Sequence, residues 1–272
     1  MSEEMKEALR EDEYLSEETG EVRCRKCNGL RRGTFSLLGV TKTVPILCSC
    51  QAEAQKKLDA ERQQREMEAL ISRYRSVGMT EPALLSCTFA NDLGYNPESK
   101  TAKNYVEHWE EMKSTATGLL FWGGVGTGKT FLAACIANAL FDKGVQVRMT
   151  NFARILNMLT DFHSGSRNEL LDELNRADLL ILDDVGMERN SEFAQEQVFN
   201  VIDSRYRSQR PMIVTTNLSL EEIKHPGNLA QARIFDRIRE RCIPVCVNNR
   251  NIRCEKAAEN MSRARELLGG KT

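Results

Sequence analysis

No stretch of the 272-residue sequence is apolar over the roughly 18–20 residues that a membrane-spanning helix requires. The N-terminus is acidic and does not lead from a basic stretch into an apolar one, so no secretory signal is expected. An excess of one charge is also missing, because 38 Lys and Arg residues stand against 39 Asp and Glu residues. This balance gives no global nucleic-acid signature, so a site for a polyanion must come from local segregation of charge.

The composition is that of an ordinary globular protein. Hydrophobic residues make up 41% and charged residues 28% of the chain, which gives enough apolar area to offset the entropy of chain folding. The length corresponds to one or two domains. Nine cysteines, an odd number, without a secretory signal indicate reduced thiols. We therefore expect a soluble cytoplasmic protein.

Charge, cysteine and glycine usage divide the chain into four parts. They are an acidic N-terminal segment, a cysteine-bearing unit, a linker helix and a large domain, at residues 1–21, 22–50, 51–82 and 83–272. The first part holds nine carboxylates and two bases, which is typical of a solvated segment that is partly helical or disordered. Residues 51–77 contain no Gly or Pro and many good helix formers. They predict a long exposed helix, which Gly78 and Pro82 end.

The large domain alternates apolar runs with amphipathic segments. The apolar runs predict strands at 118–124, 145–150, 179–185 and 211–217. Apolar residues at three- and four-residue spacing predict helices at 131–144, 151–162 and 192–209. This alternation predicts an α/β fold in which helices cover both faces of a parallel sheet.

The sequence GGVGTGKT follows the first of these runs and fits the pattern G-x-x-x-x-G-K-[ST]. Its glycines let backbone N–H groups turn onto phosphate oxygens, and the helix that begins here directs its free N–H groups at the same anion. Lys129 adds a charge between the β- and γ-phosphates, and the Thr130 hydroxyl is a magnesium ligand. The alternative is a glycine-rich turn without a ligand. The residues expected to bind nucleotide are Gly123, Gly124, Val125, Gly126, Thr127, Gly128, Lys129, Thr130 and Phe131.

Two further predicted strands end in polar residues. Asp183 and Asp184 follow a buried run, which places them at the carboxyl edge of the sheet, where ligands of open α/β sheets bind. Asp183 is suited to hold magnesium through water, and Asp184 to polarise the water that attacks a nucleoside triphosphate. Asn217 ends the next run and is suited to bond the γ-phosphate or that water. A simple turn residue is the alternative for Asn217.

The segments GGVGTGKTFLAACIANAL, LLILDDVG, PMIVTTNLSLEEI and RIFDRIRER together resemble AAA+ ATPases of the DnaC/DnaI/IstB group, over about residues 85–255. The group contains bacterial and phage replicative helicase loaders and related transposition helper ATPases. The resemblance implies a P-loop AAA+ core with a parallel five-stranded sheet and ATP hydrolysis that is weak until subunits assemble. The residues to which it gives catalytic roles are Lys129, Asp183, Asp184, Asn217 and Arg237.

Arg237 matches the family arginine that reaches the nucleotide of the neighbouring subunit, and Arg233 on the same helix face is the next candidate. Arg253 is in the place of a further family arginine, although its flanking residues depart from the pattern. The resemblance also implies that residues 151–176 line a pore for single-stranded DNA. There Phe152 and Arg154 could stack on a base and contact phosphate. Phe152 is equally well read as a core residue, and His163 as an ordinary exposed one.

The partners expected from this resemblance are a hexameric replicative DNA helicase, single-stranded DNA and further copies of the chain, with no membrane. ATP and Mg²⁺ are the expected cofactors of the large domain. A transposition helper that binds duplex DNA is the alternative, and a third reading treats ATP as an assembly switch with negligible turnover. The cysteine-bearing unit on a long helix favours the loader, because it is typical of a tethered docking module.

The cysteine-bearing unit has the ligands of a metal site. Cys24 and Cys27 are followed by Cys48 and Cys50, which supplies four thiolates from two short turns, as tetrahedral zinc requires. A small zinc-ribbon-like domain is therefore expected, with a redox pair or incidental cysteines as alternatives. The segment around Cys242 and Cys246 reads as a buried strand, so a second metal site is not expected there.

Overall fold

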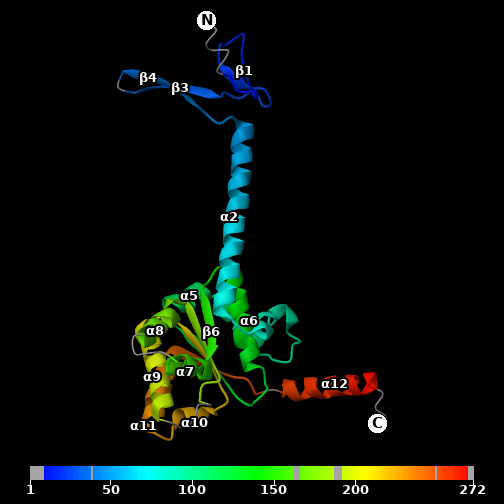
Figure 1. Cartoon of the computed structure of the whole chain (residues 1–272), viewed down its shortest axis with the longest axis vertical. Coiled ribbons are helices and arrows are strands. Elements are labelled where there is room, and N and C mark those ends of the chain that lie inside the picture. Colours follow the sequence, from blue (N-terminus) through cyan, green and yellow to red (C-terminus); the bar gives the residue numbers. More distant parts are fainter. Residues whose placement is uncertain (1–8, 38, 162–165, 187–191, 249, 269–272) are drawn as a thin grey trace. The chain divides into compact units, whose positions relative to one another are not determined.

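The computed structural model describes residues 9–37, 39–161, 166–186, 192–248 and 250–268 (Figure 1). The chain divides into two compact units, residues 1–69 and residues 70–272. Among the helices of the described residues, none combines the length and the apolar character needed to cross a membrane.

The first unit contains two antiparallel strand pairs. Strand β1 (Glu13–Leu15) pairs with β2 (Val22–Cys24), and β3 (Arg32–Leu37) pairs with β4 (Val40–Pro45) to form a hairpin. The Ile46 amide donates to the Arg31 carbonyl at the base of the hairpin. The small core of this unit includes Cys24 and Cys48, so the thiols themselves fill its centre.

The expectation of a solvated lead-in over residues 1–21 is wrong for part of that segment. Glu13 lies in β1 and is 5% exposed. Its carboxylate and that of Asp12 both bind the buried Arg31 guanidinium, at 3.1 Å and 2.6 Å. The Asp12 partner holds the pKa of Arg31 above its usual range. These acids therefore neutralise a buried cation, a pairing that the local charge count does not reveal.

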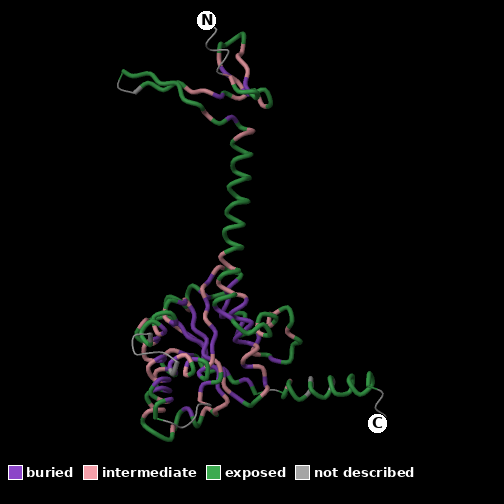
Figure 2. The backbone as a smooth tube through the Cα atoms, in the orientation of Figure 1, coloured by how far each residue is buried: buried purple, intermediate pink, exposed green. Residues whose placement is uncertain are grey.

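Helix α2 runs from Ser49 to Gly78 and spans the sequence boundary between the two units. Most of its side chains are exposed (Figure 2). Side-chain pairs at i, i+4 support it, among them the ion pair of Arg62 with Glu66 at 2.8 Å. It ends at Gly78, where a Cβ atom would lie 2.1 Å from the Val147 carbonyl oxygen. Only glycine permits this close approach.

In the described part of the second unit, five strands form a parallel sheet in the order β6-β7-β8-β5-β9. The predicted α/β class and the parallel five-stranded sheet are confirmed. The strands are β5 (Gly118–Trp122), β6 (Val147–Asn151), β7 (Leu179–Asp183), β8 (Met212–Thr216) and β9 (Cys242–Cys246).

Helices cover both faces of this sheet because side chains alternate along each strand. Leu119 and Phe121 belong to one core cluster, with residues of α4 (Ser99–Glu107), α5 (Trp109–Ser114) and α6 (Lys129–Asp142). Leu120 belongs to a second cluster on the other face. That cluster includes residues of α7 (Phe152–Asp161), α8 (Ser166–Arg176), α9 (Glu192–Arg207), α10 (Leu220–Lys224) and α11 (Leu229–Arg241).

Three further helical segments complete the description. They are α3 (Pro82–Leu85), the 3-10 turn η1 (Phe89–Asn91) and the C-terminal helix α12 (Ile252–Leu267). The carboxyl ends of β5, β6, β7 and β8 meet at one edge of the sheet, and Asn151 lies directly beside Asp183 in the strand register. The polar residues that follow these strands are thus brought together.

Candidate functional site

The glycine-rich loop connects the end of β5 to the start of α6. Gly126 and Gly128 have φ angles of 79° and 105°, in the left-handed region that favours glycine. A Cβ atom at Gly126 would lie 2.3 Å from Asn251 Oδ1, so any other residue there would also have to displace the Asn251 side chain. The loop ends where the free N–H groups of α6 begin, and this is an anion-binding geometry.

Lys129 is the first residue of α6 and is buried. Its ammonium donates to the carbonyl oxygens of Gly123 and Gly124 at 2.9 Å and 2.6 Å. Burial lowers the pKa of Lys129, and the charges of Asp184 and Asp183 oppose that shift. The cation therefore lies across the loop in which phosphate oxygens would bind.

The acidic pair is held by hydroxyl groups of two other elements. Thr130 Oγ1 donates to Asp183 Oδ1 at 3.0 Å, and Thr215 Oγ1 donates to the same oxygen at 2.6 Å. Thr215 Oγ1 also accepts from the Asp184 amide at 2.9 Å. Burial raises the pKa of Asp183, and the bond from Thr215 is the largest opposing effect. One hydroxyl thus fixes both acids.

A pocket of about 220 Å³ opens beside these groups. Six residues singled out from the sequence line it: Lys129, Thr130, Phe131, Asp184, Asn217 and Arg253, together with the loop glycines Gly126 and Gly128. Asp183 lies behind Thr130 rather than in the wall of this pocket. The glycine-rich loop, a lysine, the Thr130 hydroxyl and the Asp184 carboxylate therefore converge on one cavity, with Asp183 bound to that hydroxyl. This combination can bind and hydrolyse a nucleoside triphosphate.

A further part of the pocket wall was not found from the sequence. It consists of Asn91, at the end of η1, and of Asp92, Leu93, Tyr95 and Asn96, which lie between η1 and α4. This segment carries no phosphate motif, and only the fold brings it beside the loop, where Asn96 lies against Gly128. The contact between the loop and the start of α12 was also missed. The Ile252 amide donates to the Gly126 carbonyl at 3.0 Å, which puts Arg253 in the pocket wall.

Arg237 does not line this pocket. Its Nε donates to Asp203, and its guanidinium lies 4.8 Å from the Phe199 ring centroid and 5.6 Å from that of Tyr206. Arg233 lies one turn earlier on α11 and is exposed. Within one chain, Arg237 is therefore occupied by its own neighbours.

The structure corrects one proposed DNA contact. Phe152 is 2% exposed and belongs to the core under α7, so its ring is not available to stack on a base. Arg154 is exposed, and its guanidinium donates to the Thr80 hydroxyl. His163 lies outside the described residues.

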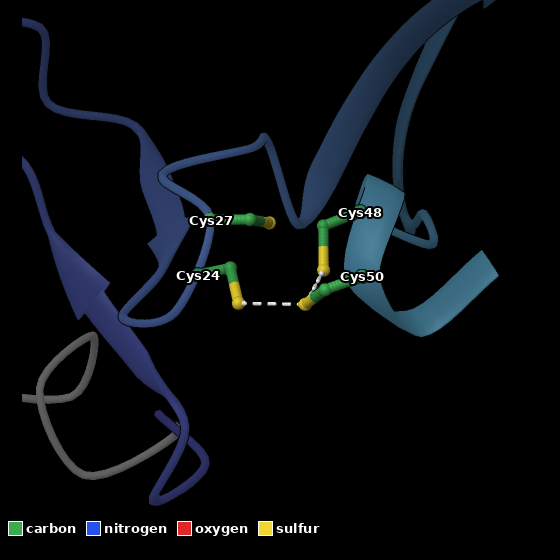
Figure 3. A group of neighbouring side chains, drawn as sticks. All are labelled: Cys24, Cys27, Cys48 and Cys50. Carbon is green, nitrogen blue, oxygen red and sulfur yellow. Dashed lines mark hydrogen bonds between the residues drawn. The ribbon is translucent and has the colours of Figure 1, made fainter. Parts of the chain in front are cut away.

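The four cysteines at the N-terminus come together although 20 residues separate the two pairs (Figure 3). Cys24 ends β2 and Cys27 lies in the turn that follows, whereas Cys48 directly precedes α2 and Cys50 lies in its first turn. All four sulfur atoms are within 4.8 Å of one another. Tetrahedral Zn–S bonds of about 2.3 Å require sulfur atoms about 3.8 Å apart. The cluster therefore fits a zinc-binding domain.

Hydrogen bonds to the sulfur atoms favour the thiolates of Cys24 and Cys27, whereas hydrogen bonds with Cys48 and Cys27 raise the pKa of Cys50 to about 12. A hydrogen bond from Ser49 and the amides of Cys50 and Gly29 lower the pKa of Cys27 to about 5. Gly29 is close enough that a Cβ atom there would lie 3.1 Å from Cys48 Cβ. The turn thus brings N–H donors to the sulfur atoms, as metal-binding thiolates require.

The fold and the pocket define a P-loop nucleotide-binding protein with an AAA+-type core. A family model for IstB-like ATP binding proteins matches residues 48–260, and the chain belongs to this family. The chain is 32% identical over 165 residues to the protein "Replicative helicase loader DnaC" of Escherichia coli strain K12. That alignment covers 58% of this chain and 65% of the relative, just under two thirds of its length.

Solved structures agree with this assignment. The crystal structure of DnaI superposes with a TM-score of 0.55 at 26% sequence identity, over 66% of this chain and 99% of that one. Domain III of the Thermotoga maritima replication initiation protein DnaA superposes with a TM-score of 0.51 at 21% identity, over 70% of this chain and 77% of that domain. At this identity the second likeness shows the fold alone.

Proposed function

We propose that the chain is an ATP-dependent loader of a hexameric replicative DNA helicase in the cytoplasm. In this proposal its N-terminal domain, residues 22–50, binds the helicase, and the AAA+ domain helps to place that helicase on single-stranded DNA. The observation that carries the proposal is the complete nucleotide pocket in a chain whose relative is named a replicative helicase loader.

Each pocket residue has a role in ATP hydrolysis under this proposal. The loop amides and Lys129 bind the β- and γ-phosphates, and the 91–96 segment faces the rest of the nucleotide. Thr130 and Asp183 would hold Mg²⁺, which neutralises charge on the phosphates when bound. Asp184, exposed in the pocket, orients and deprotonates the attacking water, and Asn217 bonds that water or the γ-phosphate.

Full activity under this proposal needs a second copy of the chain. Transfer of the γ-phosphoryl group develops charge that a cation stabilises, and an arginine supplied in trans accelerates such reactions about a thousandfold or more. Arg237 can serve after it leaves Asp203, and Arg233 can serve without that step because it is already exposed. We therefore propose α11 as the element that faces the nucleotide of the neighbour.

The cysteine cluster has a structural role in the proposal. Residues 22–50 have too few apolar side chains for a core of their own, and the four thiolates converge. Zinc bound to Cys24, Cys27, Cys48 and Cys50 would supply the folding free energy that the small core lacks. The domain then presents its surface at one end of α2.

A transposition helper ATPase that binds duplex DNA is the second candidate, because the matching family model is described as IstB-like. Binding to the helicase and filament formation on duplex DNA distinguish the loader from the transposition helper. The chain is mixed with the replicative helicase of its own organism, with and without ATP, and the mass of the complexes is measured. A stable complex with the helicase supports the loader. No complex, together with ATP-dependent filaments on duplex DNA, would support the transposition helper.

A further inference from the structure

The β3–β4 hairpin has two faces of opposite character. Because side chains alternate along a strand, alternate residues of each strand share a face. On one face hydroxyl groups pair across the strands, Thr34 with Thr43 at 3.1 Å and Ser36 with Thr41 at 2.7 Å. The described side chains of the other face are Phe35, Val40, Lys42 and Val44. We call its apolar members, Phe35, Val40 and Val44, the apolar face, and Lys42 lies beside them.

The apolar face is uncovered within the described residues of its unit. Phe35 and Val40 are each 61% exposed, Val44 is 38% exposed, and Leu47 just beyond β4 is 62% exposed. A hairpin with solvent on both faces does not need apolar side chains on either face. Exposed apolar groups gathered on one face mark a protein-interaction site more often than scattered single ones do.

The Phe35 ring packs over the backbone of its own strand at Gly33. A Cβ atom at Gly33 would lie 3.1 Å from Phe35 Cε2 and 3.2 Å from Ile46 Cγ2. The ring therefore lies over Gly33, beside Ile46, and glycine makes the space for it. An aromatic side chain has few rotatable bonds and loses little entropy on binding, which suits an anchor residue at an interface.

The charges within residues 22–50 all have one sign. Residues 22–50 contain no Asp or Glu, and their bases are Arg23, Arg25, Lys26, Arg31, Arg32 and Lys42. Three acids of the preceding segment bind bases of this unit, Asp12 and Glu13 with Arg31 and Glu21 with Arg23. Lys42 lies opposite Phe35 in the register and is exposed. The apolar face is thus bordered by positive charge.

We propose that the apolar face of the β3–β4 hairpin is the surface by which the N-terminal domain docks the helicase, and that it fits an apolar patch bordered by acidic residues on that protein. This inference rests on the proposed function. Aliphatic side chains such as Val40 and Val44 neither stack on bases nor bind phosphate, so this face suits an acidic protein surface better than a nucleic acid.

The test compares full-length variants that differ in the face they alter. Val40→Asp puts a charge on the apolar face, and Thr41→Asp puts the same charge on the polar face one residue away. Affinity for the replicative helicase is measured by titration of labelled chain, with zinc content as the control for folding. We expect Val40→Asp to weaken binding at least tenfold. Thr41→Asp should change it less than about threefold.

A second variant tests the charged border and keeps the test decisive if Val40→Asp loses its zinc. Lys42→Glu should weaken helicase binding at low salt, and the loss should shrink as salt screens the charges. Helicase binding unchanged in Val40→Asp and Lys42→Glu would overturn the inference. So would loss of single-stranded DNA binding in these variants while helicase binding remains. If the wild-type chain binds no helicase, the proposed function itself fails, which is a separate outcome.

Discussion

The hydroxyl of Thr215 offers a sharp test of how the acidic pair is built. It is fully buried, donates to Asp183 at 2.6 Å and accepts from the Asp184 amide at 2.9 Å. Thr215→Val keeps the shape of the side chain and removes both bonds. We expect the variant to fold and to bind nucleotide through the intact loop. It should hydrolyse ATP poorly, because Asp183 keeps only the bond from Thr130 and the Asp184 amide loses its acceptor.

The size of the effect follows from the kind of bond that is lost. A hydrogen bond to a charged group contributes about 1.5–3 kcal/mol. If that free energy is lost from the transition state, the rate falls about 10- to 100-fold. The Thr215 bond also lowers the pKa of Asp183 against the effect of burial. Its removal raises that pKa further, so the acidic limb of the pH–rate profile should move to higher pH.

Thr216→Val is the matched control. Thr216 is the next residue of β8, is equally buried, and donates to the Val185 carbonyl at 2.6 Å without touching either acid. It should lower stability by about 1 kcal/mol and leave the pH–rate profile unchanged. Steady-state hydrolysis at several pH values measures both variants. If Thr215→Val keeps the wild-type rate and acidic limb, the hydroxyl does not position the acids.

Four further outcomes are expected. Lys129→Ala should fold normally and lose ATP binding, because the loop loses its cation; a nucleotide titration with undiminished affinity would contradict this. Cys24→Ser or a chelator should release about one zinc per chain and unfold the N-terminal domain without melting the AAA+ core. Metal analysis that finds no zinc in the purified protein would count against this assignment. Arg237→Ala should bind ATP and hydrolyse it slowly, and mixing this variant with Lys129→Ala should restore part of the rate. If turnover per chain of the wild-type protein stays constant on dilution, Arg237 does not act on the nucleotide of a neighbouring subunit. Asp183→Asn should abolish hydrolysis yet raise the melting temperature at pH 8 and not at pH 4. A carboxyl whose folded pKa is raised loses stability as the pH rises through that pKa; calorimetry at the two pH values decides.

The sequence by itself located the parts of the site that depend on neighbours in the chain. A P-loop is eight consecutive residues, the acidic pair directly follows a buried strand, and the cysteines lie in two short turns. Each of these patterns is local, because it depends on a turn or a strand that extends over only a few consecutive residues. The α/β class followed for the same reason, since alternating runs specify layers without specifying contacts.

Tertiary structure decided which residues meet across long separations. Thr215 lies 32 residues from Asp183, and Arg237 lies 34 residues from Asp203, yet each pair is in direct contact. Phe152 follows a strand, and the sequence alone allows its side chain to face a pore. In the folded chain this side chain is buried in the core. The sequence predicts solvated acids at Asp12 and Glu13, but both bind the buried Arg31 in the folded chain. The partner of a side chain depends on strand order and on packing, and neither can be predicted from its neighbours in the sequence.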